Sequence, residues 1–365
     1  MKHLAVLYFA VLILFGATIS VSAAESNTGS NKEEKFQAGK YIIHHISDSH
    51  EWHIMSIGEL DMTIPLPVMV YSKTKGFSAF WSSKFEHGET SYNGFKIESE
   101  GTHEGSIVEV LPDGKTTDPK AELPFDLSIT KTVAGLFFNT ILLIIFGIWA
   151  GRLAKKNKGK APSSIQNVFE PLIVFIREDI AKPSIGPKYD RYMPILITFF
   201  FFILLNNLCG LIPLFPFGAN VTGNISITLV LAMITFVIST FTGNKNYWKE
   251  IFNPGVPMWM KFPVPFFPFI EFLSMIIRPI VLMIRLFANM MAGHMVVAIF
   301  IGIIFIFSKG YGAIVGYAVS PISVFFSLFM VLLDVLISII QAYVFTLLSA
   351  LYFGMSIVEN HEQHN

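Results

Sequence analysis

The stretch FIEFLSMIIRPIVLMIRLFANMMAGHMVVAIFIGIIFIF, residues 269–307, is apolar over most of its length but carries Arg285 and His294 in its interior. A second apolar stretch, residues 313–353, follows after a short glycine-containing turn and carries Asp334. Each stretch is longer than the roughly 20 residues that a perpendicular helix needs to cross a bilayer. The two stretches therefore predict a long, tilted hairpin of membrane-spanning helices.

The composition of the whole chain agrees with a membrane protein. Of the 365 residues, 53% are hydrophobic and 14% are charged, whereas a soluble domain is typically about 25% charged. The 26 basic and 26 acidic residues balance, so the chain lacks the basic excess of a nucleic-acid-binding protein. Its single cysteine, Cys209, excludes an internal disulfide framework and a CxxC zinc site. The sequence also lacks the phosphate loop GxxxxGK[ST].

Three further apolar stretches, residues 133–151, 192–215 and 225–241, predict a total of five membrane spans. Lys and Arg residues follow the first and third of these stretches, which places those ends in the cytoplasm by the positive-inside rule. The C-terminal tail, residues 359–365, is then cytoplasmic as well. Between the first two spans, Ser163–Ala181 predicts an amphipathic helix on the cytoplasmic interface, with a soluble docking helix as the alternative.

The N-terminal third of the chain differs from the rest in its polarity. Residues 1–24 have the basic start, apolar segment and small-residue end of a secretory signal peptide, with an uncleaved anchor as the alternative. Residues 25–130 are expected outside the cytoplasm, in the periplasm of a bacterium, as a small β-rich domain. Five short runs there are typical of strands: Trp52–Ile57, Leu66–Tyr71, Phe77–Trp81, Phe95–Glu98 and Ile107–Leu111.

Histidines gather at the start of this polar region, at His44, His45, His50 and His53. Imidazole is a common metal ligand, so these four are weak candidates for a metal site. Their spacing matches no standard site, and a polar surface is the alternative. No cofactor is expected elsewhere in the chain.

The polar residues of the first hairpin helix follow a helical pattern. At 100° per residue, five of them fall within an arc of about 60°: Glu271, Ser274, Arg278, Arg285 and Asn289. His294 points to the opposite side. Ionisable residues in a membrane span are expensive and usually mark a transport path.

In an antiparallel hairpin, two residues that lie at the same level have residue numbers whose sum is nearly constant. Gln341 is therefore expected level with Arg285, and Asp334 level with His294. Arg keeps its charge when buried, whereas His and Asp both exchange protons and shift each other's pKa. A fixed cation beside a titratable pair predicts a proton path, and a structural buried ion pair is the alternative.

Residues 284–294, IRLFANMMAGH, resemble the hallmark motif of subunit a of the F-type ATP synthase. Residues 340–345, IQAYVF, resemble the last-helix motif of that family, and residues 206–213 and 170–179 resemble its earlier span and interfacial helix. The resemblance covers roughly residues 130–356. The family's N-terminal segment is short, so the resemblance implies nothing about the long extension of this chain.

The resemblance implies an all-α membrane domain, residues 131–358, with no catalytic site of its own. It implies a proton-translocating stator subunit of the FO sector in the bacterial inner membrane. Its partners would be the lipid bilayer, a ring of c subunits, the b subunits of the peripheral stalk and the catalytic F1 sector. Protons and sodium ions are both compatible with the sequence.

The resemblance also implies roles for individual residues. Arg285 would face the rotor ring and separate two half-channels. The outer half-channel would be lined by Asn289, His294, Asp334 and Gln341, and the cytoplasmic one by Glu271 and Ser274, with Asn206 and Asn207 as further polar wall groups. Asp334 is one methylene shorter than the Glu found in relatives with this arrangement, so a water is expected to bridge it to His294.

Two other classes of protein compete with this interpretation. A self-contained proton-coupled secondary transporter would show internal repeats, and none is convincing here. A membrane-anchored metal-binding receptor would use the histidine cluster, but would leave the intramembrane Arg285 unexplained.

Overall fold

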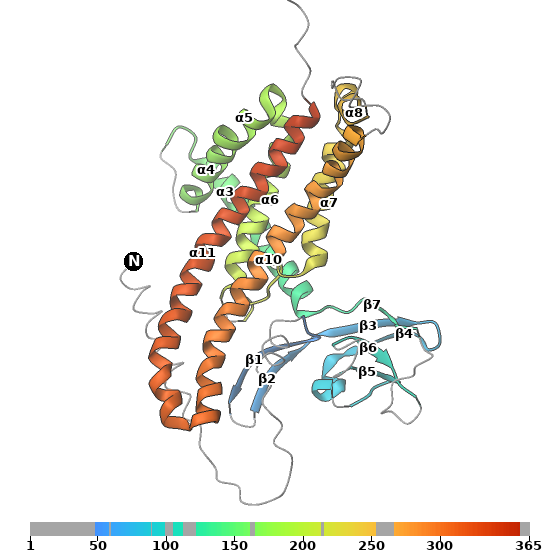
Figure 1. Cartoon of the computed structure of the whole chain (residues 1–365), viewed down its shortest axis with the longest axis vertical. Helices are drawn as coiled ribbons and strands as arrows, with labels where there is room; N and C mark the ends of the chain where they lie inside the picture. The colour runs from blue at the N-terminus through green and yellow to red at the C-terminus, as the bar shows by residue number, and fades with distance from the viewer. Residues whose placement is uncertain are drawn as a thin grey trace, which may run out of the picture.

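The structure, a computed structural model, is a bundle of long helices with a small strand-rich region at one end (Figure 1). The predicted signal peptide, residues 1–24, and the predicted tail, residues 359–365, lie outside the residues that it describes. The described residues are 48–57, 60–88, 90–98, 105–111, 122–160, 165–212, 215–252 and 266–357.

The β region, defined as the described residues between 48 and 126, is built from short antiparallel strands. Its elements are β1 (Glu51–Ile57), β2 (Leu60–Pro65), β3 (Pro67–Ser72), β4 (Gly76–Trp81), the 3-10 helix η1 (Ser82–Gly88), β5 (Phe95–Ile97), β6 (Ile107–Glu109) and β7 (Phe125–Asp126). The prediction of a small β-rich region is confirmed. The five predicted strands are present, and β2 and β7 were missed, because β2 runs on almost directly into β3 and β7 has only two residues.

The strands form three separate sheets. β1 pairs with β2, β5 pairs with β6, and a three-stranded sheet has the order β4-β3-β7. Alternate residues of β3, Val68 and Val70, are fully buried against Phe85, Phe95 and Ile107. The β5–β6 hairpin and η1 therefore cover one face of the three-stranded sheet, as the period of two in a strand requires.

Helices make up the rest of the described chain. They are α3 (Lys131–Lys156), α4 (Gln166–Phe175), the π-helical η2 (Ile176–Ala181), α5 (Lys182–Ile185), the 3-10 turn η3 (Gly186–Lys188), α6 (Tyr189–Gly210), α7 (Ile225–Phe241), α8 (Lys245–Phe252), α10 (Phe266–Tyr311) and α11 (Ala313–Ile357). Gly312, with φ of 92°, is the turn between the last two helices. A positive φ suits glycine because it has no Cβ, and the hairpin turn falls where the sequence predicted it.

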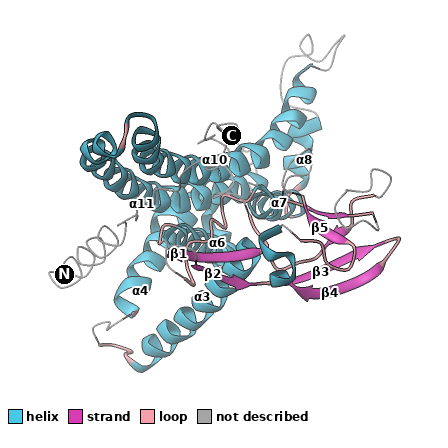
Figure 2. Ribbon diagram, turned by 90° about the horizontal axis from the view of Figure 1, so that it is seen from below, coloured by secondary structure: helices cyan, strands magenta, loops and turns pink. Residues whose placement is uncertain are grey.

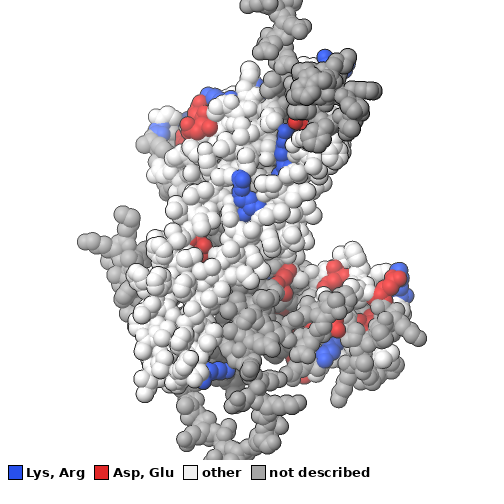
Figure 3. Space-filling model, in the orientation of Figure 1, with Lys and Arg blue, Asp and Glu red and all other residues white. Residues whose placement is uncertain are grey.

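Four helical segments are long and apolar enough to cross a membrane: Lys131–Lys156, Gln166–Gly210, Pro268–Tyr311 and Ala313–Ile357. α7 is equally apolar but has only 17 residues. Charged residues are sparse over the helical bundle in Figure 3. The chain is therefore a polytopic membrane protein.

The predicted interfacial helix and the span after it are continuous in the structure. Helical turns run from Gln166 to Gly210, and Gly186, with φ of 76°, marks a change of direction before α6. α6 ends at Gly210, five residues before the predicted end at Phe215. Pro213 cannot supply a helical N–H, and the loop after α6 folds back so that Gly218 N–H bonds to the Cys209 carbonyl oxygen at 3.0 Å.

The core of the bundle forms where α11 packs against α6 and α10. Leu196 and Ile203 from α6 and Phe345 and Phe353 from α11 are fully buried there, together with Leu282 of α10. The helices are buried to different extents. In the most apolar 18-residue segment of residues 166–210, 56% of the residues are buried, whereas in that of α10 only 11% are. Most of the surface of the α10–α11 hairpin is therefore left for lipid or for another protein.

The β region is fixed to the end of the bundle where α3 begins and α6 ends. Trp52 is 5% exposed and packs against Ala219 and Val221 of the loop after α6, with its ring 5.3 Å from that of Phe215. In the view from below, β1 and β2 lie over the end of α6, and β3–β5 extend to one side (Figure 2). Through these contacts of Trp52, the β region and the helical bundle share a small buried hydrophobic core.

Candidate functional site

Helices α10 and α11 bring together the polar residues that the sequence singled out. The Asn289 side-chain amide donates to the Gln341 carbonyl oxygen at 2.8 Å. A Cβ added to Gly293 would lie 2.5 Å from Asp334 Oδ1, so the carboxyl group sits directly against the α10 backbone. Glycine at 293 is thus what lets Asp334 approach α10 beside His294, as the predicted hairpin levels required.

The contact of Gln341 differs from the prediction by one helical turn, because it meets Asn289 rather than Arg285. Side chains of a helix lean toward its N-terminus. In an antiparallel pair, long side chains of α10 lean away from the turn, while those of α11 lean toward it. The Asn289–Gln341 contact is displaced accordingly, whereas the contact of Asp334 with the glycine backbone keeps the expected level.

Several polar atoms of this cluster are buried without a partner. His294 Nε2, Asp334 Oδ2 and Gln341 Nε2 make no hydrogen bond in the part of the chain that the structure describes. Asp334 and Gln341 are 5% and 3% exposed. Each unsatisfied buried polar group costs about 1–3 kcal/mol, so these atoms are poised for water, an ion or a partner.

A small cavity adjoins the same side chains. Its walls include Asn207 of α6, Asn289 of α10 and Asp334, Ser338 and Gln341 of α11. The volume is about 10 Å³, which is close to what one water molecule needs. The cavity therefore joins the α6 asparagine to the α10–α11 cluster through a space that suits water.

His294 and Asp334 occupy different sides of α10. The His294 ring nitrogen Nε2 lies 3.8 Å from the position of a Cβ on Gly210 of α6, whereas Asp334 faces Gly293. The two side chains form neither a hydrogen bond nor an ion pair with each other. The predicted bridging water stays a prediction.

Arg285 lies at the edge of the buried face of α10. The inner face carries Met275, Leu282, Leu286 and Met290. The polar residues that share a side of α10 with Arg285 lie about 80° around the helix axis from this face. The residue is half-buried, and Ile284 beside it is 50% exposed. No carboxylate of the described residues lies within 4.0 Å of its guanidinium group, so this cation has no counter-ion within the described chain.

A second set of polar groups links α3, α6 and the loop after α6. The Asn139 amide donates to Asn206 Oδ1 at 3.0 Å, and the Thr222 hydroxyl donates to Asn207 Oδ1 at 2.6 Å. All four residues are 2% exposed or less. Asn139 and Thr222 were missed by the sequence analysis, although an amide inside the apolar stretch 133–151 was a usable signal.

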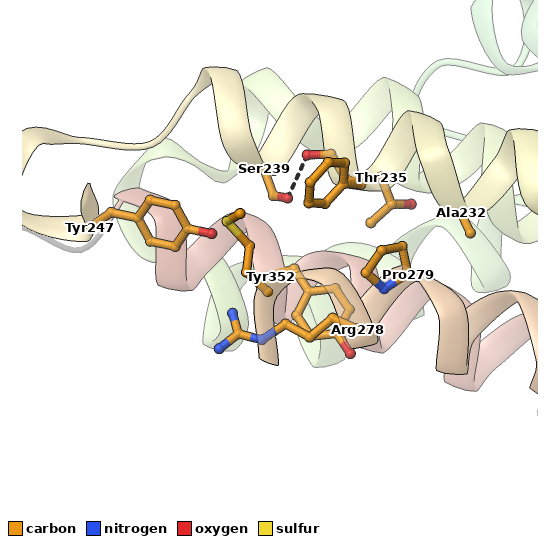
Figure 4. Close-up of a pocket in the computed structure, with 9 residues that line it drawn as sticks. Ala232, Thr235, Ser239, Tyr247, Arg278, Pro279 and Tyr352 are labelled. Atoms are coloured by element: carbon orange, nitrogen blue, oxygen red, sulfur yellow. Dashed lines mark hydrogen bonds between the residues drawn. The ribbon is translucent and has the colours of Figure 1, made fainter. Parts of the chain in front are cut away.

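The opposite end of the hairpin holds the remaining predicted residues. Glu271 is 3.6 Å from Arg278 and Ser274 is half-buried on the same stripe. The Arg278 guanidinium lies 5.7 Å from the centre of the Tyr352 ring. Figure 4 shows Arg278 and Tyr352 at the mouth of a small pocket beside Tyr247 and Ser239.

The structure describes only part of the histidine cluster. His50 Nε2 lies 2.9 Å from Asp126 Oδ2. His44 and His45 lie outside the described residues, and the side chain of His53 is not described. Among the described residues no three His, Cys, Asp or Glu side chains gather as metal ligands, so a metal site at these four histidines stays a prediction.

Fold and site together define a polytopic membrane protein. Within its longest hairpin, an arginine and two other ionisable groups lack an ionic or hydrogen-bond partner among the described residues. The family described as ATP synthase A chain matches residues 135–354, and the chain belongs to this family. It is thus a non-catalytic FO subunit. Residues 41–127 match a separate domain of unknown function, DUF8433.

Curated relatives support the same assignment. The chain is 39% identical over 269 residues to ATP synthase subunit a of Chloroherpeton thalassium, covering 72% of this chain and 76% of the relative. It is 42% identical over 272 residues to ATP synthase subunit a 2 of Chlorobaculum tepidum, covering 72% and 73%. With ATP synthase subunit a of Myxococcus xanthus it shares 37% identity over 243 residues, or 65% and 75%.

Proposed function

We propose that this chain is the proton-translocating stator subunit of an FO sector and that Arg285 separates two half-channels. The observation that carries the proposal is a half-buried arginine, without a carboxylate partner in the described chain, on a long apolar helix. Such a cation favours the ionised form of any carboxyl group that passes it. Since none of the described residues supplies such a carboxyl group within 4.0 Å of Arg285, a neighbouring ring of c subunits would supply it.

The outer half-channel would run from the external end of α6 to the α10–α11 hairpin. Asn206 and Asn207 would hold water near the entrance, and the cavity beside Asp334 would lead onward. His294 and Asp334 would pass the proton, because both side chains can gain and lose one at accessible pH. Asn289 and Gln341 would orient water by hydrogen bonding.

The cytoplasmic half-channel would lie near Glu271 and Ser274. Glu271 is partly exposed at the edge of the bundle, where a carboxylate can release a proton to water. In this arrangement a proton bound from outside can leave inward only after a rotor carboxyl group has travelled around the ring, since Arg285 blocks the direct path.

The proposal includes the membrane topology. α3, α6, α7, α10 and α11 would be five spans, α4 would lie along the cytoplasmic interface, and the domain from residue 131 to 358 would sit in a bacterial inner membrane. The region from 25 to 130 would be periplasmic after a signal peptide, and the C-terminus cytoplasmic. The b subunits and the F1 sector would be the other partners.

Replacement of Arg285 by Ala tests the proposal. We expect assembled complexes in inverted vesicles to lose ATP-driven proton pumping, measured by quenching of a pH-sensitive dye. Arg278→Ala is the matched control, because Arg278 lies two turns away on the same stripe but has Glu271 as a partner. Full pumping by Arg285→Ala would exclude the proposed role, and purification of an active chain without small ring subunits would favour a self-contained transporter.

A further inference from the structure

One face of the β4-β3-β7 sheet has no cover from the described chain. Strand residues alternate between faces, and the inward ones are packed against β5–β6 and η1. On the outward face Tyr71 is 51%, Phe77 62%, Trp81 58% and Phe125 66% exposed. Four large aromatic side chains on one sheet face make a contiguous apolar patch, which soluble surfaces rarely show.

The strand register makes this patch continuous. Tyr71 of β3 lies opposite Phe77 of β4 on one side and Phe125 of β7 on the other. Met69 lies opposite Ala79, and Trp81 follows at the end of β4. We call these six residues the aromatic face: none of them carries a charge, and three strands align them into one surface.

The connection to α3 holds this face close to the membrane. Four residues, 127–130, separate β7 from α3, and four residues span at most about 14 Å. The Leu127 N–H bonds to the Met69 carbonyl oxygen at 2.8 Å, and the Ile129 N–H bonds to that of Pro67 at 3.1 Å. Because the linker extends the pairing along β3, the sheet is rigidly joined to the point where α3 begins.

The direction of the aromatic face follows from the layers of the β region. The β5–β6 hairpin covers the opposite face of the sheet. Figure 1 shows β7 and β3 on the side of the helices, with β6 and β5 farther from them. The aromatic face is therefore turned toward the level of the bundle, beside the helices that cross the bilayer.

The chemistry of the face suits one partner. Trp, Tyr and Phe side chains are favoured where a bilayer meets water, since their rings are apolar and the Tyr and Trp tips remain polar. Between the patch and α3, Leu127 is 53% exposed, and Phe137 on α3 itself is 58% exposed. At the rim, the exposed pair Lys73 and Glu122 provides charge for the aqueous side.

We propose that the aromatic face rests on the outer surface of the lipid bilayer, with its rings in the interfacial zone next to α3. The β region is then a membrane-resting platform, fixed by Trp52 to the bundle and by the aromatic face to lipid. This inference rests on the proposed topology, in which α3 crosses the membrane and begins outside, and not on the path that protons take.

Spin labels on single introduced cysteines test the inference in the full complex. Ala79 lies at the centre of the aromatic face, is exposed and is small, so Ala79→Cys should not disturb the core. Ser106→Cys is the matched control, because Ser106 is exposed in the turn before β6, in the layer on the other side of the sheet. The native Cys209 is buried, so unsubstituted chain gives the labelling background.

The complex is reconstituted into vesicles of phosphatidylcholine and phosphatidylglycerol, and collisions of each label with oxygen and with a water-soluble nickel chelate are compared. We expect the ratio of oxygen to nickel collisions to be several-fold higher at position 79 than at position 106. Equal ratios with strong nickel collisions would place the face in water. Weak collisions with both reagents at position 79 would mean that a protein covers it, and either result overturns the inference.

Tryptophan fluorescence gives an independent measurement. The emission of Trp81 is obtained as the difference between the unsubstituted chain and the Trp81→Phe variant. In vesicles whose lipids carry brominated acyl chains, this difference should be strongly quenched relative to unbrominated vesicles. An unquenched Trp81 component would contradict contact with lipid, and Trp52, which is buried against the bundle, sets the level expected for a shielded ring.

Discussion

At the junction between the β region and α3, polar groups bond to one another, whereas in the α10–α11 hairpin several find no partner among the described residues. Asp48 accepts from the Thr130 hydroxyl at 2.7 Å and from the Thr132 N–H at 3.0 Å, and His50 is bonded to Asp126. His294 and Asp334, by contrast, each keep a buried atom without a hydrogen bond.

The bonded groups suit a structural role at the junction, and the unbonded ones suit the proton exchange that we propose for the hairpin. Satisfied groups at the junction fix the start of α3 in the manner of a helix cap. Unsatisfied groups in the hairpin oppose folding by about 1–3 kcal/mol each, so packing elsewhere must offset them. A buried polar group without a partner stays available to bind water or a proton, which a proton path requires.

Among the groups compared here, the two titratable groups of the hairpin are expected to give the largest effect. Asp334→Ala and His294→Ala should each lower ATP-driven proton pumping by about 100-fold, as expected for the loss of a proton-transfer group. The double exchange of His294 for Asp and Asp334 for His should retain clearly more pumping than either single change. If the exchanged chain is as inactive as the single variants, the two positions do not act as a pair.

A smaller but still large effect is expected at Gly293. An added methyl group would collide with the Asp334 carboxyl group, so Gly293→Ala should displace it and lower pumping by about tenfold or more. Gly310→Ala is the matched control, because a Cβ at that glycine on the same helix meets nothing within 4 Å. Similar pumping by the two variants would show that the position of Asp334 is not critical.

Trp52 tests the structural side of the comparison. Trp52→Ala removes the ring that packs on Ala219 and Val221, and we expect it to weaken docking of the β region by about 3 kcal/mol. The readout is protease sensitivity of the detergent-solubilised complex. Trp81→Ala, at a tryptophan exposed by 58%, should leave protease sensitivity unchanged in detergent, and equal sensitivity of the two variants would refute the docking role of Trp52.

The smallest effect is expected from pH at the junction. Burial alone would raise the pKa of Asp126, but hydrogen bonds from His50 and Ser128 outweigh it and hold this pKa below the ordinary 3.8. A depressed carboxyl pKa contributes stability that is complete above the ordinary value and is lost as pH falls through the folded one. The protection of amides at the junction, measured as the exchange rate relative to the intrinsic rate at the same pH, should therefore fall below about pH 4, and Asp126→Asn should remove that pH dependence.

The sequence predicted most of the helices, and it singled out candidate site residues whose roles stay predictions. Long apolar runs with few charges leave little alternative to spanning helices, and Arg285, His294 and Asp334 stand out because charge is rare there. It missed β2 and β7, which are too short or too close to a neighbour for a pattern to show. It also missed Asn139 and Thr222, whose importance depends on contacts with α6.

Residue order is enough to predict a polytopic membrane protein, the level of Asp334 in the hairpin and the family, because hydropathy, helical period and motif can be read along the chain. Three features appear only once the chain is folded: His294 and Asp334 face different sides of α10, Asn289 rather than Arg285 meets Gln341, and an aromatic face beside α3 has no cover from the described residues. These depend on how side chains lean, on the glycine that admits a carboxyl group, and on which strands pair.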